Sequence, residues 1–198
     1  MRGEPSRGLG LVELLAVLAM LGVVAMVAFP GLGRLKRSAE IAAASRELAT
    51  TLESLRWIST TERRYVGLWF DHADARWSWW RVADGNGNGL RAREIADGSD
   101  LTVSGPHDWR RNGNRTLIGL PPMRVRRIPP GRGWMPVPRD PIRFGQSDLV
   151  SFAPDGSSSS GTVFLTDGRQ EVAAVVLYGG TGRVRVWRWN LRKEVWTR

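Results

Sequence analysis

A run of alternating oxygen-bearing residues is the first feature that could do chemistry. Residues 84–89 have the D-x-N-x-N-G pattern that begins a calcium-binding loop. Oxygen donors at alternate positions can converge on a hard cation, and the candidate ligands are Asp84, Asn86, Asn88 and Glu94. Ile95 occupies the twelfth loop position, where an EF-hand needs a bidentate Glu, and we expect no flanking helices. Two interpretations of this segment remain: a calcium site, or a simple Gly/Asn turn between strands.

A basic strand near the carboxyl end of the chain is the second candidate. Residues 182–189 read as a strand, in which Arg183 and Arg185 face the same side as Trp187 while Arg188 faces the other. A basic stripe beside an aromatic ring can hold a phosphate backbone while bases stack. Duplex DNA is therefore a candidate partner of Arg183, Arg185 and Arg188. The alternative is a solvated cationic strand that discourages aggregation.

Positive charge is high over the whole chain and is concentrated in a second segment. The sequence has 29 Lys and Arg against 19 Asp and Glu, a formal net charge of +10. This charge favours polyanions or an anionic membrane surface as partners, although a genome rich in Arg codons would have the same effect. The second segment either extends the polyanion surface or is a solvated loop, and its arginines are Arg110, Arg111, Arg115, Arg124, Arg126, Arg127, Arg132, Arg139 and Arg143.

An apolar run near the amino terminus has a single carboxylate at its head. The run from Leu14 to Gly33 carries no charge and follows Glu13 directly. It is as long as the roughly 20 residues of a membrane-spanning helix, and a carboxylate in such a segment is costly. A secretory signal peptide, an ordinary anchor helix and a buried helix of a soluble domain are the plain alternatives.

The same segment resembles the prepilin amino terminus of type IV pilins and type II secretion pseudopilins. In that family a prepilin peptidase cuts after a Gly that ends a short basic leader, the new terminal residue is N-methylated, and the fifth mature residue is Glu. Here the cleavage would follow Gly8, Leu9 would be methylated, and Glu13 would be the fifth residue. Pro30 falls where the family often has a helix-bending Pro. Leu9 and Gly10 depart from the usual Phe and Thr or Ser.

The resemblance gives Glu13 a role in assembly. A neighbouring subunit's free terminal amine could pair with this carboxylate in a packed helix bundle and offset the cost of burying it. The expected partners are therefore other pilin or pseudopilin subunits, the prepilin peptidase and an inner-membrane assembly platform.

The elements that position these residues are a long helix and then strands. Apolar residues recur at steps of three or four and predict one buried helix face: Ile41, Ala44, Leu48, Leu52, Leu55 and Ile58. We expect one helix from about Leu9 to about Glu62, with a bend or local melting near Pro30. Strands are predicted at 65–70, 76–82, 101–103, 116–120, 149–152, 161–165, 171–177 and 182–189, with an extended loop at 121–141. Trp69, Trp77 and Trp79 should share one sheet face, opposite Trp80.

The carboxyl-terminal strands are similar to the GspH/FimT group of minor pilins and pseudopilins. The similarity lies in Phe152-Ala153-Pro154-Asp155-Gly156, in the strand 161–165 and in Gly182-Arg183-Val184-Arg185. The last motif also resembles the G-R-x-R motif of FimT-like minor pilins that bind DNA during uptake. Residues 71–146 resemble nothing beyond a variable insertion. The resemblance implies an α+β pilin fold, in which a long helix packs on an antiparallel β-rich head.

These observations predict an organisation and a function. We expect a leader at 1–8, a transmembrane and filament-core helix at 9–33, its amphipathic continuation at 34–64 and a periplasmic head at 65–198. The subunit would reside in the inner membrane as a single-pass protein before entering a pilus or pseudopilus, at or near its tip. DNA capture for natural transformation is the alternative function.

The sequence also makes an enzyme improbable. The chain has no Cys, which excludes a Cys nucleophile and Cys-ligated zinc. His72 and His107 are expected in surface loops, and the Ser157–Ser160 run lacks a nucleophile elbow. We expect no catalytic residues and no cofactor other than the calcium considered at residue 84.

Overall fold

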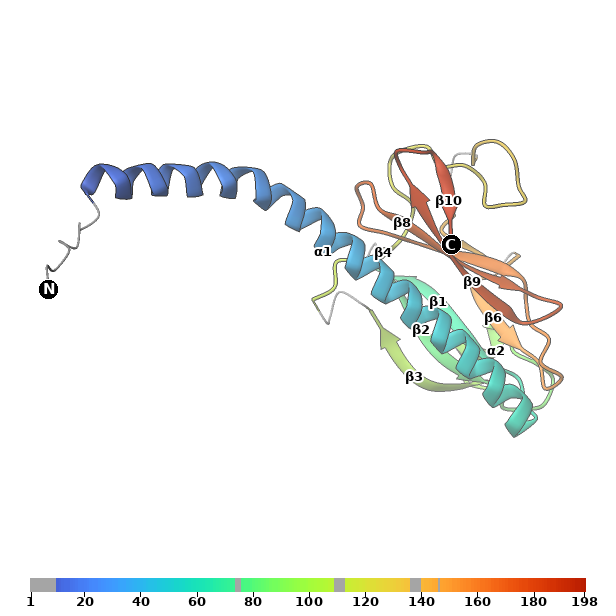
Figure 1. Ribbon diagram of the computed structural model, residues 1–198. Helices are drawn as coiled ribbons and strands as arrows, with labels where there is room; N and C mark the ends of the chain where they lie inside the picture. The colour runs from blue at the N-terminus through green and yellow to red at the C-terminus, as the bar shows by residue number, and fades with distance from the viewer. Residues whose placement is uncertain (1–9, 74–75, 109–112, 136–139, 146) are drawn as a thin grey trace, which may run out of the picture. The chain divides into compact units, whose positions relative to one another are not determined.

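The computed structural model describes residues 10–73, 76–108, 113–135, 140–145 and 147–198, apart from the side chains of residues 25 and 27–32. The chain divides into two units, Met1–Lys36 and Arg37–Arg198. Helix α1 (Leu11–Glu62) contains 52 residues and contributes to both units (Figure 1). A bend or local melting was predicted near Pro30. The backbone stays helical at residues 30–33, so the helix does not melt there.

The first unit presents an apolar helix surface. Large apolar side chains between residues 11 and 26 are 53–79% exposed. They are Leu11, Val12, Leu14, Leu15, Val17, Leu18, Met20, Leu21, Val23, Val24 and Met26. Over the described residues, no helix contains an 18-residue stretch apolar enough to cross a membrane.

The second unit combines the rest of α1 with two antiparallel sheets, so the fold class is α+β as predicted. The four-stranded sheet has the order β3-β2-β1-β6, and the other has the order β10-β9-β8-β7-β4 with β5 also paired to β7. The strands are β1 (Val66–Ala73), β2 (Arg76–Ala83), β3 (Leu101–His107), β4 (Leu117–Ile118), β5 (Ile142–Arg143), β6 (Leu149–Phe152), β7 (Gly161–Thr166), β8 (Val172–Tyr178), β9 (Arg183–Asn190) and β10 (Val195–Thr197). The predicted hairpin of β1 and β2 is confirmed, whereas β5 and β10 were not predicted.

The second half of α1 and both sheets share one hydrophobic core. Five of the six residues of the predicted helix face are at most 3% exposed: Ile41, Ala44, Leu48, Leu52 and Leu55. They form one cluster with inward side chains of both sheets, including Phe70 and Val175. Burying a large apolar side chain contributes about 1.5–3 kcal/mol, and the three-to-four-residue spacing is what directs these residues to one side.

The tryptophans of the four-stranded sheet divide differently from the prediction. Trp77 and Trp79 pack at the shared core. Trp69 instead lies directly opposite Trp80 in the β1–β2 register, with ring centroids 5.0 Å apart on the other face. The prediction was wrong for Trp69 because Leu68 beside it points into the core, and side chains alternate along a strand.

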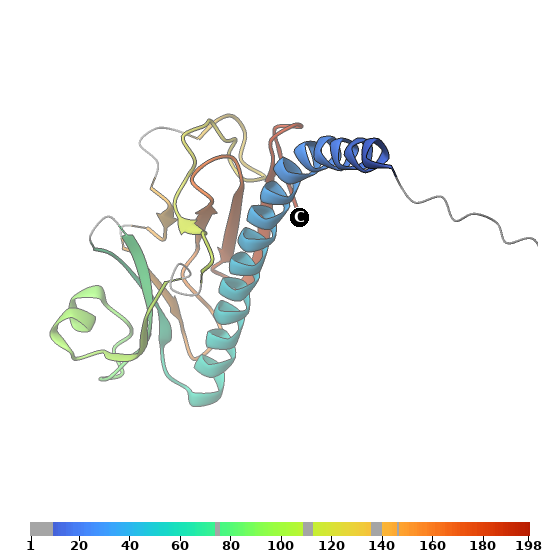
Figure 2. The same cartoon turned by 90° about the vertical axis from the view of Figure 1, so that its left-hand side faces the viewer.

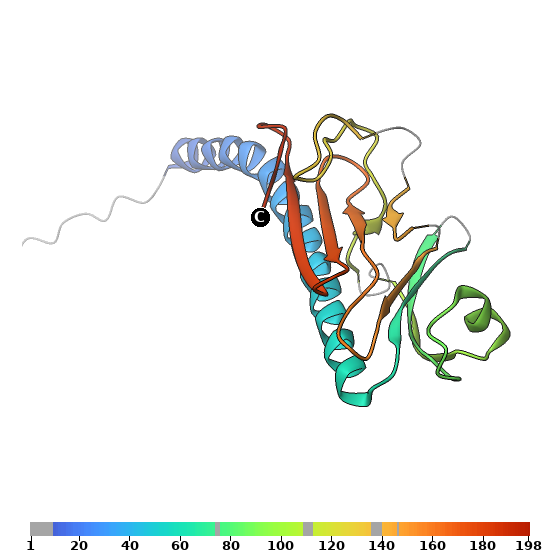
Figure 3. The same cartoon turned by 90° about the vertical axis from the view of Figure 1, so that its right-hand side faces the viewer.

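A short helix covers the outer face of the four-stranded sheet. Helix α2 (Ala92–Asp97) lies on the side of β1 and β2 away from α1 (Figures 2 and 3). Its Ile95 is buried with Val82 and Leu149 in a separate cluster. The expectation that no helix flanks the Asp84 loop was therefore wrong, because Ile95 supplies an apolar anchor for one.

The other sheet also buries side chains on both faces. Val184 and Val186 of β9 pack on the core shared with α1. Trp187 and Trp189 alternate with them and lie on the outer face, in a second cluster with Val125 and others from the 120–135 segment. We call the face that bears Trp187 and Trp189 the outer face of the six-stranded sheet.

Candidate functional site

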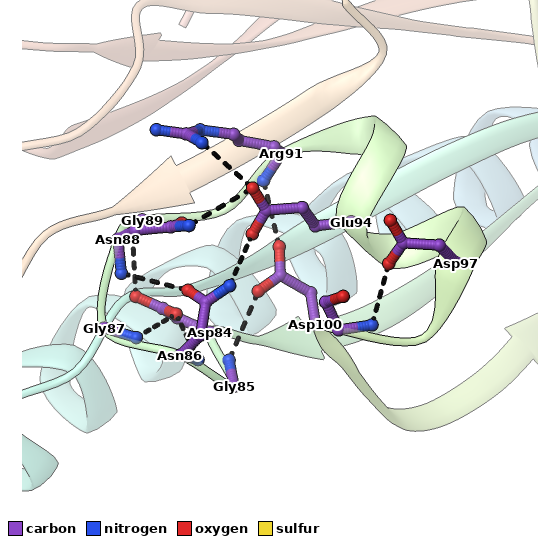
Figure 4. Close-up of polar contacts among 11 residues, drawn as sticks. Asp84, Gly85, Asn86, Gly87, Asn88, Gly89, Arg91, Glu94, Asp97 and Asp100 are labelled. Carbon is purple, nitrogen blue, oxygen red and sulfur yellow. Dashed lines mark hydrogen bonds and ion pairs between the residues drawn. The ribbon is translucent and has the colours of Figure 1, made fainter.

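The loop after β2 folds around the carboxylate of Asp84 (Figure 4). Asp84 is 8% exposed and accepts the backbone N–H groups of Asn86 at 3.0 Å, Gly87 at 2.7 Å and Gly89 at 2.8 Å. Burial by itself raises the pKa of Asp84, but the hydrogen bonds from Gly89, Asn86, Gly87 and Asn88 outweigh it and hold that pKa below its ordinary value. The ionised carboxylate is thus the organising group of the loop.

Two further carboxylates complete this network. Glu94 accepts the side-chain N–H groups of Asn86 at 2.8 Å and Asn88 at 3.2 Å, and it pairs with Arg91 at 2.9 Å. These contacts, the Asn86 hydrogen bond first, hold the pKa of Glu94 below its ordinary value. Asp100 is 1% exposed and accepts backbone N–H groups from both ends of the loop, at 3.2 and 3.0 Å.

The predicted calcium ligands lie close together, but the carboxylate oxygens of Asp84 and Glu94 accept hydrogen bonds from N–H groups of the loop. Asn86 and Asn88 turn their amide nitrogens, and not their oxygens, toward Glu94, whereas calcium takes oxygen ligands. Across the described part of the chain, no three His, Asp or Glu side chains are grouped so that they could hold a metal ion. The geometry is that of a hydrogen-bonded turn, and calcium binding stays a prediction.

Strand β9 presents Arg183 and Arg185 on the outer face, as their alternation predicts. Arg183 lies opposite Tyr178 and Arg185 lies opposite Val176 in the β8–β9 register. Val184 between them packs toward the core shared with α1, so both arginines face away from that helix. Arg183 is exposed and Arg185 is half-buried.

A helix residue braces the turn that begins this strand. Arg56 of α1 donates from Nε to the carbonyl oxygen of Gly156 at 3.2 Å. It also lies over Gly182, where a Cβ would come within 2.7 Å of the same Nε. Gly182 has a φ of 59°, so both its conformation and its close contact favour glycine.

Arg188 faces the opposite way. Its Nη2 donates to the hydroxyl of Ser38 on α1, and it lies opposite Ala173, a core residue of β8. The structure therefore does not bring Arg188 to the surface that carries Arg183 and Arg185.

Aromatic rings on the outer face lie beneath arginine side chains. The guanidinium carbon of Arg185 is 5.5 Å from the ring centroid of Tyr178, and that of Arg198 is 4.9 Å from Trp187. Trp134, in the 120–135 segment, has both Arg124 and Arg126 over its ring, at 5.0 and 4.9 Å. Such cation–π contacts contribute about 0.5–1 kcal/mol at exposed sites and fix the guanidinium in place.

Sequence reasoning missed the partner of Trp187. Residues 195–197 are β-branched and aromatic and follow a turn at 190–194, a pattern that could have predicted β10. In the structure Trp196 lies opposite Trp189, and this pairing brings Arg198 over Trp187.

Part of the predicted amino-terminal site can be placed. Gly8 and Leu9 lie outside the described residues. Glu13 is in the first turn of α1, where its Oε2 accepts the backbone N–H of Gly10 at 3.2 Å. A carboxylate is favoured at this end of a helix. Of Pro30 only the helical backbone is described.

Both histidines lie in strands, so the prediction of loop positions was wrong. His72 is in β1, with its ring 4.8 Å from that of Trp77, and His107 at the end of β3 stacks on Trp79 at 4.2 Å. Burial lowers the pKa of His107, and the charge of Arg81 lowers it further.

No family model, curated protein or solved structure matches this chain. The functional argument therefore depends on the residues and on their geometry.

Proposed function

We propose that this chain is a minor pilin or pseudopilin subunit of the GspH/FimT type. A prepilin peptidase would cut it after Gly8, and the subunit would then join a type IV pilus or a type II secretion pseudopilus at or near the tip. The observation that carries the proposal is the first part of α1. Its apolar side chains between Leu11 and Met26 are 53–79% exposed, and Glu13 is the single charged residue between Gly8 and Gly33.

Such a helix needs an apolar environment at every stage. Before assembly, the inner membrane would hold it as a single-pass anchor with the head in the periplasm. After assembly, neighbouring subunits would cover it, and Glu13 would pair with the methylated amine of a neighbour's Leu9. The pairing offsets the cost of a carboxylate in an apolar bundle, so it would set the register between subunits.

The second unit supports the same proposal. Residues 37–62 of α1 form one core with two antiparallel sheets, which is the architecture that the family resemblance implies. A folded second unit that follows an apolar helical segment in the chain suits a subunit that is embedded through the helix and exposes the head.

The experiment is coexpression with a prepilin peptidase and the other filament subunits. Wild-type protein should lose residues 1–8, as intact-mass measurement would report, and should appear in sheared filaments. Gly8→Val should remain uncut. Glu13→Ala should be cut but excluded from filaments, because the pairing carboxylate is gone.

The matched control is Glu53→Ala, which removes an exposed carboxylate of the same helix outside the apolar run. It should be processed and assembled like wild type. An uncut wild-type chain would overturn the proposal, and so would filament entry of Glu13→Ala at the wild-type level.

Capture of duplex DNA during natural transformation is a second candidate function. The specific observation in its favour is that Arg183 and Arg185 share the outer face of the sheet. They also lie in the G-R-x-R pattern of FimT-like DNA-binding minor pilins. The two functions are compatible, since an assembled subunit could bind DNA through its head.

A further inference from the structure

We infer that duplex DNA is bound by a surface that extends well beyond Arg183 and Arg185, and that this surface contacts the phosphate backbone without stacking bases. The inference rests on the proposed DNA-capture function and adds contacts to that site. We call the surface the arginine face, and its members are Arg124, Arg126, Arg143, Arg183, Arg185 and Arg198.

The first step is the row along β9. Arg183, Arg185 and Trp187 are two residues apart in turn, so their side chains leave the outer face at intervals of roughly 6.7 Å. Trp187 is the third residue of this row and has no charge of its own. Arg198 lies over its ring and adds a positive charge there. Arg183, Arg185 and Arg198 thus lie on the same face of the sheet, along β9 or over it.

The second step links this row to the 120–135 segment. Trp196, which pairs with Trp189 of β9, donates from Nε1 to the carbonyl oxygen of Arg126 at 2.8 Å. Arg126 forms a β-bridge with Trp134 and, together with Arg124, lies over its ring. The row and the segment therefore belong to one surface.

The third step crosses the sheet. Arg143 of β5 lies opposite Thr162, Thr162 opposite Val176, and Val176 opposite Arg185. Residues in such a line point to the same face, and three strand spacings separate the backbones of Arg143 and Arg185 by roughly 14 Å. The major groove of B-DNA is about 12 Å wide, so the two arginines can contact phosphates on both strands of a duplex.

The charge of the surface is largely unopposed. Five of the six arginines are exposed and Arg185 is half-buried. Among the described residues, Glu194 is the one carboxylate within ion-pair distance of the arginine face, 3.9 Å from Arg126, and both side chains are about half exposed at 49% and 55%. An exposed pair of this kind is weak and screened by salt, so phosphate can replace it.

The fourth step concerns the aromatic rings. Trp187 is 7% exposed and has Arg198 against it, and Trp134 carries two arginines. Single-stranded DNA binders need open ring faces on which bases stack. Arginine side chains lie over these two rings, and guanidinium groups held in this way can donate to phosphate. The expected partner is therefore a duplex, bound without sequence preference.

The orientation of the surface agrees with this role. The opposite face of the sheet packs on α1 residues such as Leu48 through the shared core. Assembly through the helix would leave the arginine face uncovered.

The test measures binding of the full-length chain, in mild detergent, to a fluorescent 20-base-pair duplex of mixed sequence across a salt series. Wild type should bind with strong salt dependence, because each phosphate contact adds about 0.9 to the slope of log affinity against log salt. The pair Arg183→Gln/Arg185→Gln, the pair Arg124→Gln/Arg126→Gln and the pair Arg143→Gln/Arg198→Gln should each weaken binding about tenfold and lower the slope by about 2.

The matched control is Arg76→Gln/Arg93→Gln, which removes two exposed arginines located outside the arginine face, at the start of β2 and in α2. It should bind like wild type. Circular dichroism of every variant checks that the fold is retained.

The outcomes separate this inference from the function on which it rests. No binding by wild type would overturn the DNA-capture function itself. Loss confined to the Arg183/Arg185 pair would keep that function and overturn the extended surface. Tighter binding to single strands of the same length than to the duplex, or binding to anionic vesicles in preference to DNA, would overturn the choice of partner.

Discussion

Asp84 is the residue whose type matters most to the local structure. An ordinary turn needs no buried carboxylate, yet here three backbone N–H groups converge on one side chain that is 8% exposed. The residue types of the loop were visible in the sequence, but their partners were not. Asparagine amides can present either nitrogen or oxygen, and only the position of Glu94 decides which end faces inward.

We expect Asp84→Asn to destabilise the fold by about 1–3 kcal/mol at pH 7, because a neutral amide cannot accept three hydrogen bonds as a carboxylate does. The folded pKa of Asp84 is lowered, so its contribution is present above the unfolded pKa of about 3.9 and is lost as the pH falls through the folded pKa. Urea unfolding across pH measures both effects.

The control for this substitution is Asp97→Asn. Asp97 is exposed and accepts the backbone N–H of Ser99 at 3.0 Å. Its loss should change stability by less than about 0.5 kcal/mol. Equal stability of Asp84→Asn and wild type at pH 7 would contradict the organising role.

At the scale of elements, a glycine allows β6 to approach β1 closely. A Cβ at Gly67 would lie 1.9 Å from the carbonyl oxygen of Val150 and 2.8 Å from Cδ1 of Leu90. Backbone cannot yield as a flexible side chain does, so this position requires glycine for reasons of space. The register of β1 with β6, which completes the four-stranded sheet, depends on it.

Gly67→Ala should therefore lower the free energy of unfolding by about 1–3 kcal/mol through overpacking. Gly180→Ala is the matched control, since a Cβ there meets nothing within 4 Å. Denaturant unfolding of the two variants compares them directly. A Gly67→Ala protein as stable as the control would mean that β1 and β6 can separate without cost.

The elements show where sequence reasoning succeeds and where it ends. The helix face from Ile41 to Leu55 was predictable because the spacing of its apolar residues is visible within a short stretch of sequence. That spacing places them on one side of the helix, where they are buried. The two-residue strand β5 carries too little pattern to define a strand. Trp69 was assigned to the wrong face because the prediction did not use the register of the hairpin. The stacking of Arg198 on Trp187 depends on contacts between strands, which no local pattern contains.

At the scale of the whole molecule, the two units differ in the chemical character of their surfaces. The first exposes apolar side chains along a helix, whereas the second buries large apolar side chains in its core clusters and carries the arginine face. The described core of the second unit contains no residue before Ile41. Folding of the head should therefore not require the first unit.

We expect a chain that begins at Arg34 to fold with an unfolding temperature within a few degrees of the full chain and to remain monomeric without detergent. The full chain should need detergent, because its exposed apolar helix surface is of the kind that drives association. Thermal circular dichroism and size-exclusion chromatography make the comparison. A truncated chain without cooperative unfolding would contradict the independence of the head.

Strand β9 is tied to α1 near both of its ends. Arg56 lies over Gly182, and Ser38 accepts from Arg188. The helix between residues 38 and 56 is about 27 Å long, and the strand between 182 and 188 is about 20 Å long. The strand therefore contacts the helix at two separate points along its length. Since close-packed interiors transmit strain, tension along the helix would be shared with the strand. Under the proposed DNA-capture function, a pull on DNA held by the arginine face would reach the helix at two points.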